Sequence, residues 1–588
     1  MKAKLISLLR AHWRVLVCAL VLAALLGSPL YLIPHELGSA YKGVDIVHFG
    51  NDEHGYLVRG EEVLEGHGLG QIYLSDGKDT SDPTFSQVER FMLFPFTFFH
   101  LHPNIVTVYN AVNTIAIFFL ALVIYAFVFA MSGDSLLAAA AAVFVIGGYS
   151  IIEEKSLFFS SFNIYGRSVF PFASSIPFFG FLLLTYEAIV SRKSAWYSIV
   201  AGVILGALFY DYFYAWTFAA ALLATLFVVL LVRRDIPGVM RTMLIGSIGI
   251  VLGLGTIIPF LQLYASQSGG QLSYFLWSVH GRTPIMSLAG LAGLLIYGLY
   301  WWRMKGADKN SPFILACIVA GWIALNQQLI TGSFVQYGHY YWYFIVPVLI
   351  CLCLYMVGKC IPRRLMVWVY GALIALAFVS TAGGQYQSVK HNLSGNEHDQ
   401  SYASLLSVLA SLPRGTILTG PGSDSQSLLV PIYTDDDLYW YVGATTYHTS
   451  FDRIEEALLV YLYLNHDARK DPIGFLQKEL SKDINSPYSL LFENIEGYRS
   501  GLDYYSYEAA LQHSDSALLS KRPAILSEVR ERYAALLPND AALRALLLER
   551  GVTYVLWDSA LYPEGDLSPL QPLTVIATST DLTLYKLQ

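Results

Sequence analysis

Residues 195–232 read AWYSIVAGVILGALFYDYFYAWTFAAALLATLFVVLLV, and this stretch decides the fold class of the chain. It is about twice as long as the roughly 20 residues that a helix needs to cross the hydrocarbon core of a membrane. Its one charged residue, Asp211, lies in the middle among tyrosine, phenylalanine and tryptophan side chains. Such aromatic side chains collect at membrane–water interfaces. The stretch therefore predicts two spanning helices, 195–210 and 214–232, joined by a tight turn at Asp211.

The same pattern recurs through residues 15–383. Of the 588 residues, 55% are hydrophobic and only 14% are charged, whereas a soluble protein has about 25% charged residues. The pattern predicts about eleven spans, namely the two above and 15–33, 104–131, 135–152, 168–190, 241–264, 283–302, 312–330, 341–358 and 366–383. We expect a mostly α fold, with a polytopic transmembrane helix bundle in residues 1–383 and a soluble α/β domain in residues 384–588.

Basic residues in the loops predict the orientation. Lys2, Lys4, Arg10 and Arg14 precede the first span, which is long enough to remain as an uncleaved helix. With a cytoplasmic N-terminus, alternation of the spans puts the later basic clusters on the same side, as the positive-inside rule requires. These clusters are Arg192 and Lys193, Arg233 and Arg234 with Arg241, Arg303 with Lys305 and Lys309, and Lys359 with Arg363 and Arg364. We expect a multi-pass protein of the plasma (inner) membrane with an extracytoplasmic C-terminal domain.

Charge and cysteine content exclude some classes. The net charge of −7 gives no reason to expect nucleic acid as a partner. The five cysteines lie in or beside apolar runs, so neither a disulfide framework nor a cysteine zinc site is expected.

The soluble domain has the periodicities of an α/β fold. Helix patterns cover 401–412 and 541–550, and strand patterns cover 416–419, 552–557, 575–577 and 582–587, the last two as a hairpin. Its elements look self-contained, so we expect a domain that folds without the bundle and supplies no catalytic group. Asp435, Asp436 and Asp437 are interpreted as a solvated turn.

The first outer loop carries the pattern that points to chemistry. Asp52 and Glu53 open a predicted short helix, and Asp52, Tyr56 and Arg59 share one helical face at i, i+4 and i+7. A structural interpretation is also open, because Asn51 or Asp52 suits a helix N-cap and acidic residues are favoured near a helix N-terminus.

The segment 50–69, GNDEHGYLVRGEEVLEGHGL, resembles the first outer loop of the GT-C superfamily of membrane glycosyltransferases. The positions that match the family's pattern are Asp52, Glu53, Tyr56, Arg59 and Gly66 to Gly68. Glu61 departs from the pattern, because the family frequently has an asparagine at that position. The resemblance implies an enzyme that takes its sugar from a polyprenyl-phosphate carrier. It also implies that Asp52 is the base that deprotonates the acceptor, with Glu53 assisting or orienting it.

Other polar residues at the predicted outer ends of spans are further candidates. Because cations can hold a donor phosphate, we assign that role to Arg59, Arg167, Arg282 and His339. Acceptor orientation, or a divalent metal that the resemblance implies as Mg²⁺ or Mn²⁺, is assigned to Glu153, Glu154 and Asp211. Substrate contact is assigned to Tyr56 and Tyr340. The ordinary interpretations also stay open: a solvated loop for the two glutamates, and an interfacial belt for Arg167 and the aromatic residues. We expect the acids and Arg59 and Arg167 to line one cavity at the outer membrane face.

The function expected is transfer of a sugar from a lipid-linked donor in the membrane to an extracytoplasmic glycan, lipid or protein. Two alternatives stay open. One is a transporter or flippase for a lipid-linked glycan, and the other is a non-catalytic membrane protein that binds envelope glycan. Transporters often bury polar groups near the membrane midplane, in repeated halves. Here the acids cluster at the outer ends of helices and no repeat is evident, which favours the enzyme.

Overall fold

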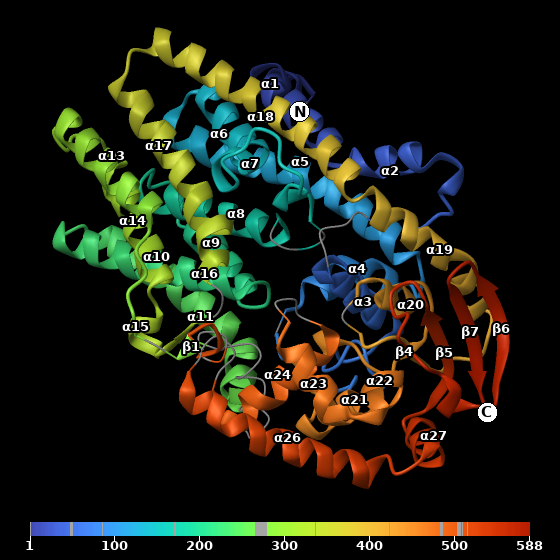
Figure 1. The fold of residues 1–588 in the computed structure, drawn as a ribbon. Helices are drawn as coiled ribbons and strands as arrows, with labels where there is room; N and C mark the ends of the chain where they lie inside the picture. The colour runs from blue at the N-terminus through green and yellow to red at the C-terminus, as the bar shows by residue number, and fades with distance from the viewer. Residues whose placement is uncertain are drawn as a thin grey trace.

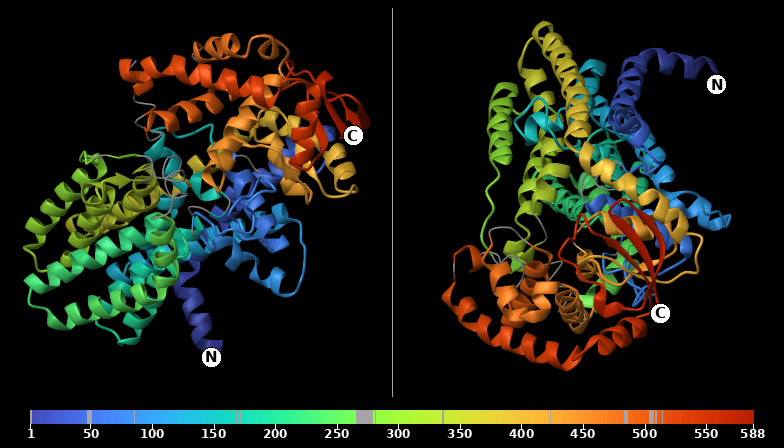
Figure 2. Two further views of the ribbon diagram at one scale, coloured as in Figure 1. Left: turned by 90° about the horizontal axis from the view of Figure 1, so that it is seen from below. Right: turned by 45° about the vertical axis from the view of Figure 1, so that its right-hand side comes forward.

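Apolar helices form a bundle at one end of the molecule, and a mixed α/β domain lies at the other end (Figures 1 and 2). The computed structural model describes residues 2–46, 51–84, 86–167, 169, 172–264, 279–280, 282–334, 337–422, 424–482, 486–502, 507, 510–513 and 515–588. The bundle helices are α1 (Lys2–Leu26), α2 (Pro29–Leu37), α5 (Ile105–Ser132), α6 (Ser135–Gly147), α8 (Phe172–Ile189), α9 (Trp196–Leu208), α10 (Phe213–Val232), α11 (Ile236–Tyr264), α13 (Leu288–Met304), α14 (Ser311–Leu325), α17 (Val346–Cys360) and α18 (Arg363–His391).

Each predicted span corresponds to a helical segment, and the chain is a polytopic membrane protein. Within the described residues, six segments are long and apolar enough to cross a membrane: His12–Ala40, Ile105–Ser132, Phe213–Val232, Ile236–Leu263, Gly338–Cys360 and Arg363–His391. The remaining predicted spans are the shorter helices α6, α8, α9, α13 and α14. The span predicted over 135–152 is interrupted at Gly148, after which α7 (Tyr149–Glu153) begins.

A two-residue turn, Gly133 and Asp134, joins α5 to α6 and shows why these helices end where they do. The Asn104 side chain accepts a hydrogen bond from the Thr107 amide at 3.0 Å and begins α5. Gly133 ends α5 in the left-handed conformation with φ +68°, which glycine adopts without strain. Asp134 then caps α6 by accepting from the Leu136 amide at 2.9 Å.

Glycines allow α9 and α11 to approach closely. A Cβ at Gly202 would lie 2.7 Å from Ile248 Cβ, and one at Gly206 would lie 2.5 Å from Leu252 Cβ. The contact is reciprocal, because Gly249 and Gly253 of α11 receive the side chains of Leu205 of α9 and of Phe209, which follows the end of α9. Small residues four apart are a common way for membrane helices to pack, since the hydrophobic effect supplies no attraction between helices in lipid.

Polar contacts join the loops at one end of the bundle. Arg192 Nη2 lies 2.6 Å from Asp235 Oδ2, and Arg363 Nη2 lies 3.4 Å from Asp134 Oδ2. The Asn310 side chain donates to the Met131 carbonyl at 3.0 Å. These contacts place the loops after α5, α8, α10, α13 and α17 on one face, which agrees with the predicted alternation. The compartment that this face meets stays a prediction.

The C-terminal part contains a five-stranded sheet in the order β4-β3-β5-β7-β6. Strands β4 (Asp437–Leu438), β3 (Thr416–Leu418) and β5 (Val552–Asp558) are parallel, whereas β7 (Leu582–Leu587) and β6 (Leu573–Ser579) form the predicted antiparallel hairpin. The helices around it are α19 (Leu393–Leu409), α20 (Leu429–Tyr433), α21 (Phe451–Tyr463), α22 (His466–Lys470), α23 (Pro472–Leu480), α24 (Pro487–Ser500), α26 (Ser516–Leu536) and α27 (Asp540–Glu549). The predicted α/β class is confirmed.

The first outer loop shares a core with this domain. It contains α3 (Asn51–Glu65) and α4 (Val88–Phe98). Leu57, Val58 and Tyr73 of the loop belong to the same buried cluster as Tyr402 and Trp440 of the domain. The expectation of a self-contained domain is therefore wrong. Part of its apolar surface is covered by a segment that comes more than 300 residues earlier in the chain.

Two further details correct the sequence analysis. Helix α18 continues through the expected boundary at residue 384 and ends at His391. Only Asn392 separates it from α19. Asp436 and Asp437 are not a solvated turn, because both are buried. Asp437 forms an ion pair with Lys78 of the first outer loop, with 2.5 Å between Oδ1 and Nζ. A buried carboxylate needs such a partner, and a sequence pattern does not reveal one so distant in the chain.

Candidate active site

Asp52 and Glu53 lie in the first turn of α3 and differ in exposure. The Asp52 side chain is 74% exposed, whereas that of Glu53 is 1% exposed. Neighbouring residues on a helix point in different directions, so one acid faces solvent and the other faces the protein. The side chain of Asn51, a candidate N-cap, lies outside the described residues.

Arg167 joins both acids. Its Nε donates to Glu53 Oε1 at 2.6 Å, and its Nη2 donates to Asp52 Oδ2 at 2.8 Å. The third contact is from Nη1 to the Tyr343 hydroxyl at 3.4 Å. The guanidinium therefore links the first outer loop, the second outer loop and the start of the span that ends with α17.

The loop that carries Arg167 is capped locally and held by two helices. Asn163 caps the short turn η2 (Ile164–Gly166) by accepting from the Tyr165 amide at 2.9 Å. Its side-chain amide also donates to the Ile146 carbonyl at 2.8 Å. On the other side of the turn, Asn113 of α5 donates to the Gly166 carbonyl at 2.7 Å. Arg167 thus projects from a loop whose backbone is fixed to two helices.

Aromatic side chains surround the Arg167 side of the site. The Tyr212 hydroxyl lies 2.7 Å from His339 Nδ1, and the His339 ring centroid lies 5.2 Å from that of Tyr343. Tyr340, expected to contact substrate, is buried at 1% exposure, and its hydroxyl lies 2.7 Å from Thr217 Oγ1. His339 is therefore near the site but engaged with a tyrosine, and Tyr340 packs into the bundle.

Burial dominates the electrostatics of this cluster. It raises the pKa of Glu53 from 4.5 to about 7, although the adjacent Arg167 opposes the shift. Burial also raises the pKa of Tyr56 well above its ordinary value. Burial disfavours the charged form of Arg167, but the carboxylate of Glu53 outweighs this and raises the pKa of the guanidinium. The site therefore holds a permanent positive charge beside one exposed and one buried carboxyl group.

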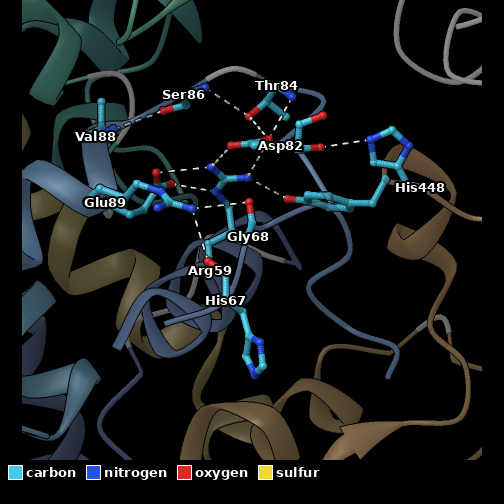
Figure 3. Close-up of polar contacts among 12 residues, drawn as sticks. Arg59, His67, Gly68, Asp82, Thr84, Ser86, Val88, Glu89 and His448 are labelled. Carbon is cyan, nitrogen blue, oxygen red and sulfur yellow. Dashed lines mark hydrogen bonds and ion pairs between the residues drawn. The ribbon is translucent and has the colours of Figure 1, made fainter. Parts of the chain in front are cut away.

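Arg59 does not join this cluster. Its Nε donates to Glu89 Oε1 at 2.7 Å and its Nη2 to Asp82 Oδ2 at 2.7 Å, and all three side chains are buried (Figure 3). Its Nη1 also donates to the Tyr447 hydroxyl of the C-terminal domain at 3.3 Å. Asp52, Tyr56 and Arg59 are predicted to share one helical face. The Arg59 guanidinium is nevertheless paired with the carboxylates of Asp82 and Glu89. These contacts favour a structural role for Arg59 over the expected contact with a donor phosphate.

The remaining candidates have surroundings of their own. Asp211 borders the site through its neighbour Tyr212, but its carboxylate oxygens are buried beside Ser174, and burial raises its pKa to about 7. Glu153 is the last residue of α7 and lies beside Tyr149 of the same helix. Glu154 follows as the C-cap. Arg282 donates to the Leu329 carbonyl at 3.0 Å in an exposed segment. The structure thus joins Asp52, Glu53 and Arg167 directly and leaves Arg282 in a separate contact.

The donor set at Arg167 does not fit a divalent ion. Asp52 and Glu53 both face one fixed guanidinium, which would repel a metal ion bound to the same oxygens. Among the described residues, the group of three ligand atoms within 4.8 Å of one another is formed by Glu62, Glu65 and His67, not by Glu153, Glu154 and Asp211. In that group Glu62 already pairs with Lys78, and Glu65 pairs with Arg414 at 2.8 Å.

Sequence reasoning missed Tyr343 as a partner of Arg167, and Asp82, Glu89 and Tyr447 as partners of Arg59. Tyr343 belongs to an aromatic stretch between two spans, and that composition does not single out one tyrosine. Asp82 and Glu89 follow Arg59 in the same loop. Their opposite charge is the sequence feature that could have indicated an ion pair with Arg59. The Tyr447 contact joins residues 388 positions apart and has no local pattern.

No protein-family model and no curated protein sequence matches the chain. Solved structures of an oligosaccharyltransferase from Archaeoglobus fulgidus are similar to it. One, in complex with zinc and sulfate, has 12% identity and a TM-score of 0.39, and covers 93% of this chain and 68% of its own. Another, the archaeal oligosaccharyltransferase AglB with an inhibitory peptide and a dolichol-phosphate, has 13% identity and a TM-score of 0.39, and covers 94% of this chain and 70% of its own.

A third structure of that enzyme, tethered to an acceptor peptide, has 13% identity and a TM-score of 0.39, and covers 98% of this chain and 74% of its own. At this TM-score the likeness is distant, and the interpretation of the site rests on its own contacts.

Proposed function

We propose that this chain is a membrane glycosyltransferase of the GT-C type. It moves a sugar from a polyprenyl-phosphate donor to a glycan, lipid or protein acceptor outside the cytoplasm. The observation that carries the proposal is the double contact of Arg167 with Glu53 and Asp52. It places a potential base and a fixed cation side by side in loops that follow membrane helices, where the phosphate of a lipid-anchored donor must lie.

Asp52 is the base in this proposal. Its carboxylate takes the proton of the acceptor while the acceptor atom bonds to the anomeric carbon of the sugar. The bond from that carbon to the phosphate oxygen breaks, and the polyprenyl phosphate leaves with the electron pair. The exposed carboxylate is suited to this role, because it can be reached by an acceptor without rearrangement of the protein.

Arg167 stabilises the departing phosphate. A guanidinium presents several N–H donors in a plane and matches phosphate oxygens bidentately. Glu53 orients it from the buried side through Nε, so that the Nη groups face Asp52 and Tyr343. Donor entry requires the phosphate to share or displace the Asp52 contact, which would free the Asp52 carboxylate for the proton.

The C-terminal domain supports α3 and shapes access for the acceptor. Tyr447 contacts Arg59, and the Leu438 amide donates to the Tyr73 carbonyl at 2.8 Å. These contacts support the helix that carries Asp52. No step of the proposed reaction passes through a metal ion.

A transfer assay on purified protein tests the proposal. Polyprenyl-phosphate donors with different sugars are incubated with mixed acceptors, and the release of polyprenyl phosphate is measured. We expect release with at least one donor, and slower release without acceptor. Translocation of a lipid-linked glycan across vesicles, with no release for any donor, would instead support the flippase.

A further inference from the structure

A cavity of about 670 Å³ opens at the end of the bundle opposite to Asp52. It is lined by His12 of α1, by Tyr125 and Phe129 of α5, and by residues at the end of α8 and in the following loop. Asn113, which holds the Arg167 loop, precedes Tyr125 by 12 residues on the same helix, a rise of about 18 Å. The cavity is therefore separate from the proposed active site, and its function does not depend on the proposed reaction.

The polar part of the cavity is predominantly basic. Lys193 and Lys309 line it together with one acid, Glu187. Glu187 is buried and forms an ion pair with Lys193, with 3.0 Å between Oε1 and Nζ. Counting these three groups, the lining carries one net positive charge. A molecule that binds to these two lysines in the cavity should therefore be anionic.

Neutral donors and an apolar wall complete the lining. His12 Nδ1 lies 2.5 Å from the Tyr125 hydroxyl, and the His12 ring packs edge-on against Phe129. Ser191 adds a hydroxyl next to Lys193. The apolar wall consists of Ala126, Phe129, Ala130, Leu183 and Val190. A ligand that fills this space needs a polar anionic part and an apolar part.

We propose that this cavity binds the headgroup and upper acyl chain of an anionic phospholipid. The lysines contact the phosphate, and the hydroxyls of Tyr125 and Ser191 donate to headgroup oxygens. The apolar wall belongs to helices that lie in the hydrocarbon, so an acyl chain reaches it directly. Basic pockets between membrane helices are suited to anionic headgroups, while the cation of a zwitterionic headgroup would face the lysines unfavourably.

Native mass spectrometry of the full-length protein tests the site. The protein is purified in phosphatidylcholine nanodiscs, released, and titrated with phosphatidylglycerol, with phosphatidylcholine and with inorganic phosphate. We expect one phosphatidylglycerol molecule to bind in preference to phosphatidylcholine. The Lys193→Gln/Lys309→Gln variant should bind it more weakly, by about five-fold for each lysine.

The matched control is Lys305→Gln/Lys359→Gln. These exposed lysines lie on the same face of the bundle but do not line the cavity, and their loss changes the total charge equally. We expect the control to bind phosphatidylglycerol like the unmodified chain. Equal weakening in both variants would overturn the proposal, because it would show a general surface effect.

A second variant, Ala130→Trp, keeps the lysines and fills the apolar part of the cavity. It should also lose phosphatidylglycerol, which tests the site even if the lysine variant does not fold. Retention in Ala130→Trp, equal affinity for phosphatidylcholine, or displacement of the lipid by inorganic phosphate at equal concentration would overturn the assignment to a phospholipid.

Discussion

Arg167 Nε lies 2.6 Å from Glu53 Oε1, although the two residues are 114 positions apart in the chain. The carboxyl group is buried, so this contact supplies the positive charge that a buried acid needs. The same guanidinium reaches the exposed Asp52. One arginine thus ties a buried acid to an exposed acid.

Asp52→Asn is expected to abolish sugar transfer and leave the melting temperature nearly unchanged. Asparagine cannot accept the proton, whereas the lost ion pair is exposed and contributes less than about 1 kcal/mol to stability. Transfer rate and thermal unfolding of the purified variant are the measurements. Asp452→Asn is the matched control, because that side chain is 80% exposed and also pairs with an arginine, Arg532. Full transfer activity in Asp52→Asn would remove this residue from the mechanism.

Glu53→Gln is expected to change how stability depends on pH. The pKa of Glu53 is raised to about 7 in the folded protein, so between about pH 5 and 7 the folded state binds a proton that the unfolded state has lost. The stability of the unmodified chain should therefore fall by up to about 1.4 kcal/mol per pH unit in this window.

The measurement for this prediction is thermal unfolding at intervals from pH 5 to 8. The stability of the unmodified chain minus that of Glu53→Gln should decrease as pH rises. Glu528→Gln, at a carboxylate that is 59% exposed, controls for the general effect of pH on unfolding. A constant difference between Glu53→Gln and the unmodified chain would show that Glu53 does not titrate in this range.

Arg59→Met is expected to lower the free energy of unfolding by about 3–5 kcal/mol. The substitution leaves the buried carboxylates of Asp82 and Glu89 without their positive partner. Arg90→Met, at an exposed arginine in the same loop, should cost less than about 1 kcal/mol. Equal unfolding temperatures for the two variants would contradict a structural role for Arg59.

Truncation after Gly395 is expected to unfold the first outer loop. The core that covers Leu57, Val58 and Tyr73 is built largely from residues after 400, so their removal exposes this apolar surface. Hydrogen exchange of α3, compared between the full and truncated chains, measures the effect. A truncated chain that stays monodisperse with α3 still protected would show that the loop folds without the domain.

The C-terminus is expected to lie outside the cytoplasm and the loop 233–241 inside it. The basic clusters and the alternation of spans agree on this orientation. Reporter fusions at Gln588 and within that loop give the measurement. A cytoplasmic reporter at Gln588 would invert the orientation and place Asp52 on the wrong side for an extracytoplasmic acceptor.

Most of the fold follows from local properties of the sequence. Apolar runs such as 214–232 predict helices because a backbone in lipid must satisfy its own hydrogen bonds. The strands near 416, 552 and 582 follow from short runs of β-branched and apolar residues. The extra length of α18 beyond residue 383 was not predicted, because hydropathy marks where a helix leaves the membrane and not where it ends.

The sequence by itself determined the helical bundle, the grouping of basic loops and the acidic pair Asp52–Glu53 as a candidate site. Only the tertiary structure decided that Arg167 pairs with these two acids, whereas Arg59 pairs with Asp82 and Glu89. It also decided that the first outer loop belongs to the core of the C-terminal domain. The physical reason is that hydropathy and helical periodicity act over neighbouring residues, whereas the partner of a charge or an apolar face is set by packing between segments that are far apart in the chain.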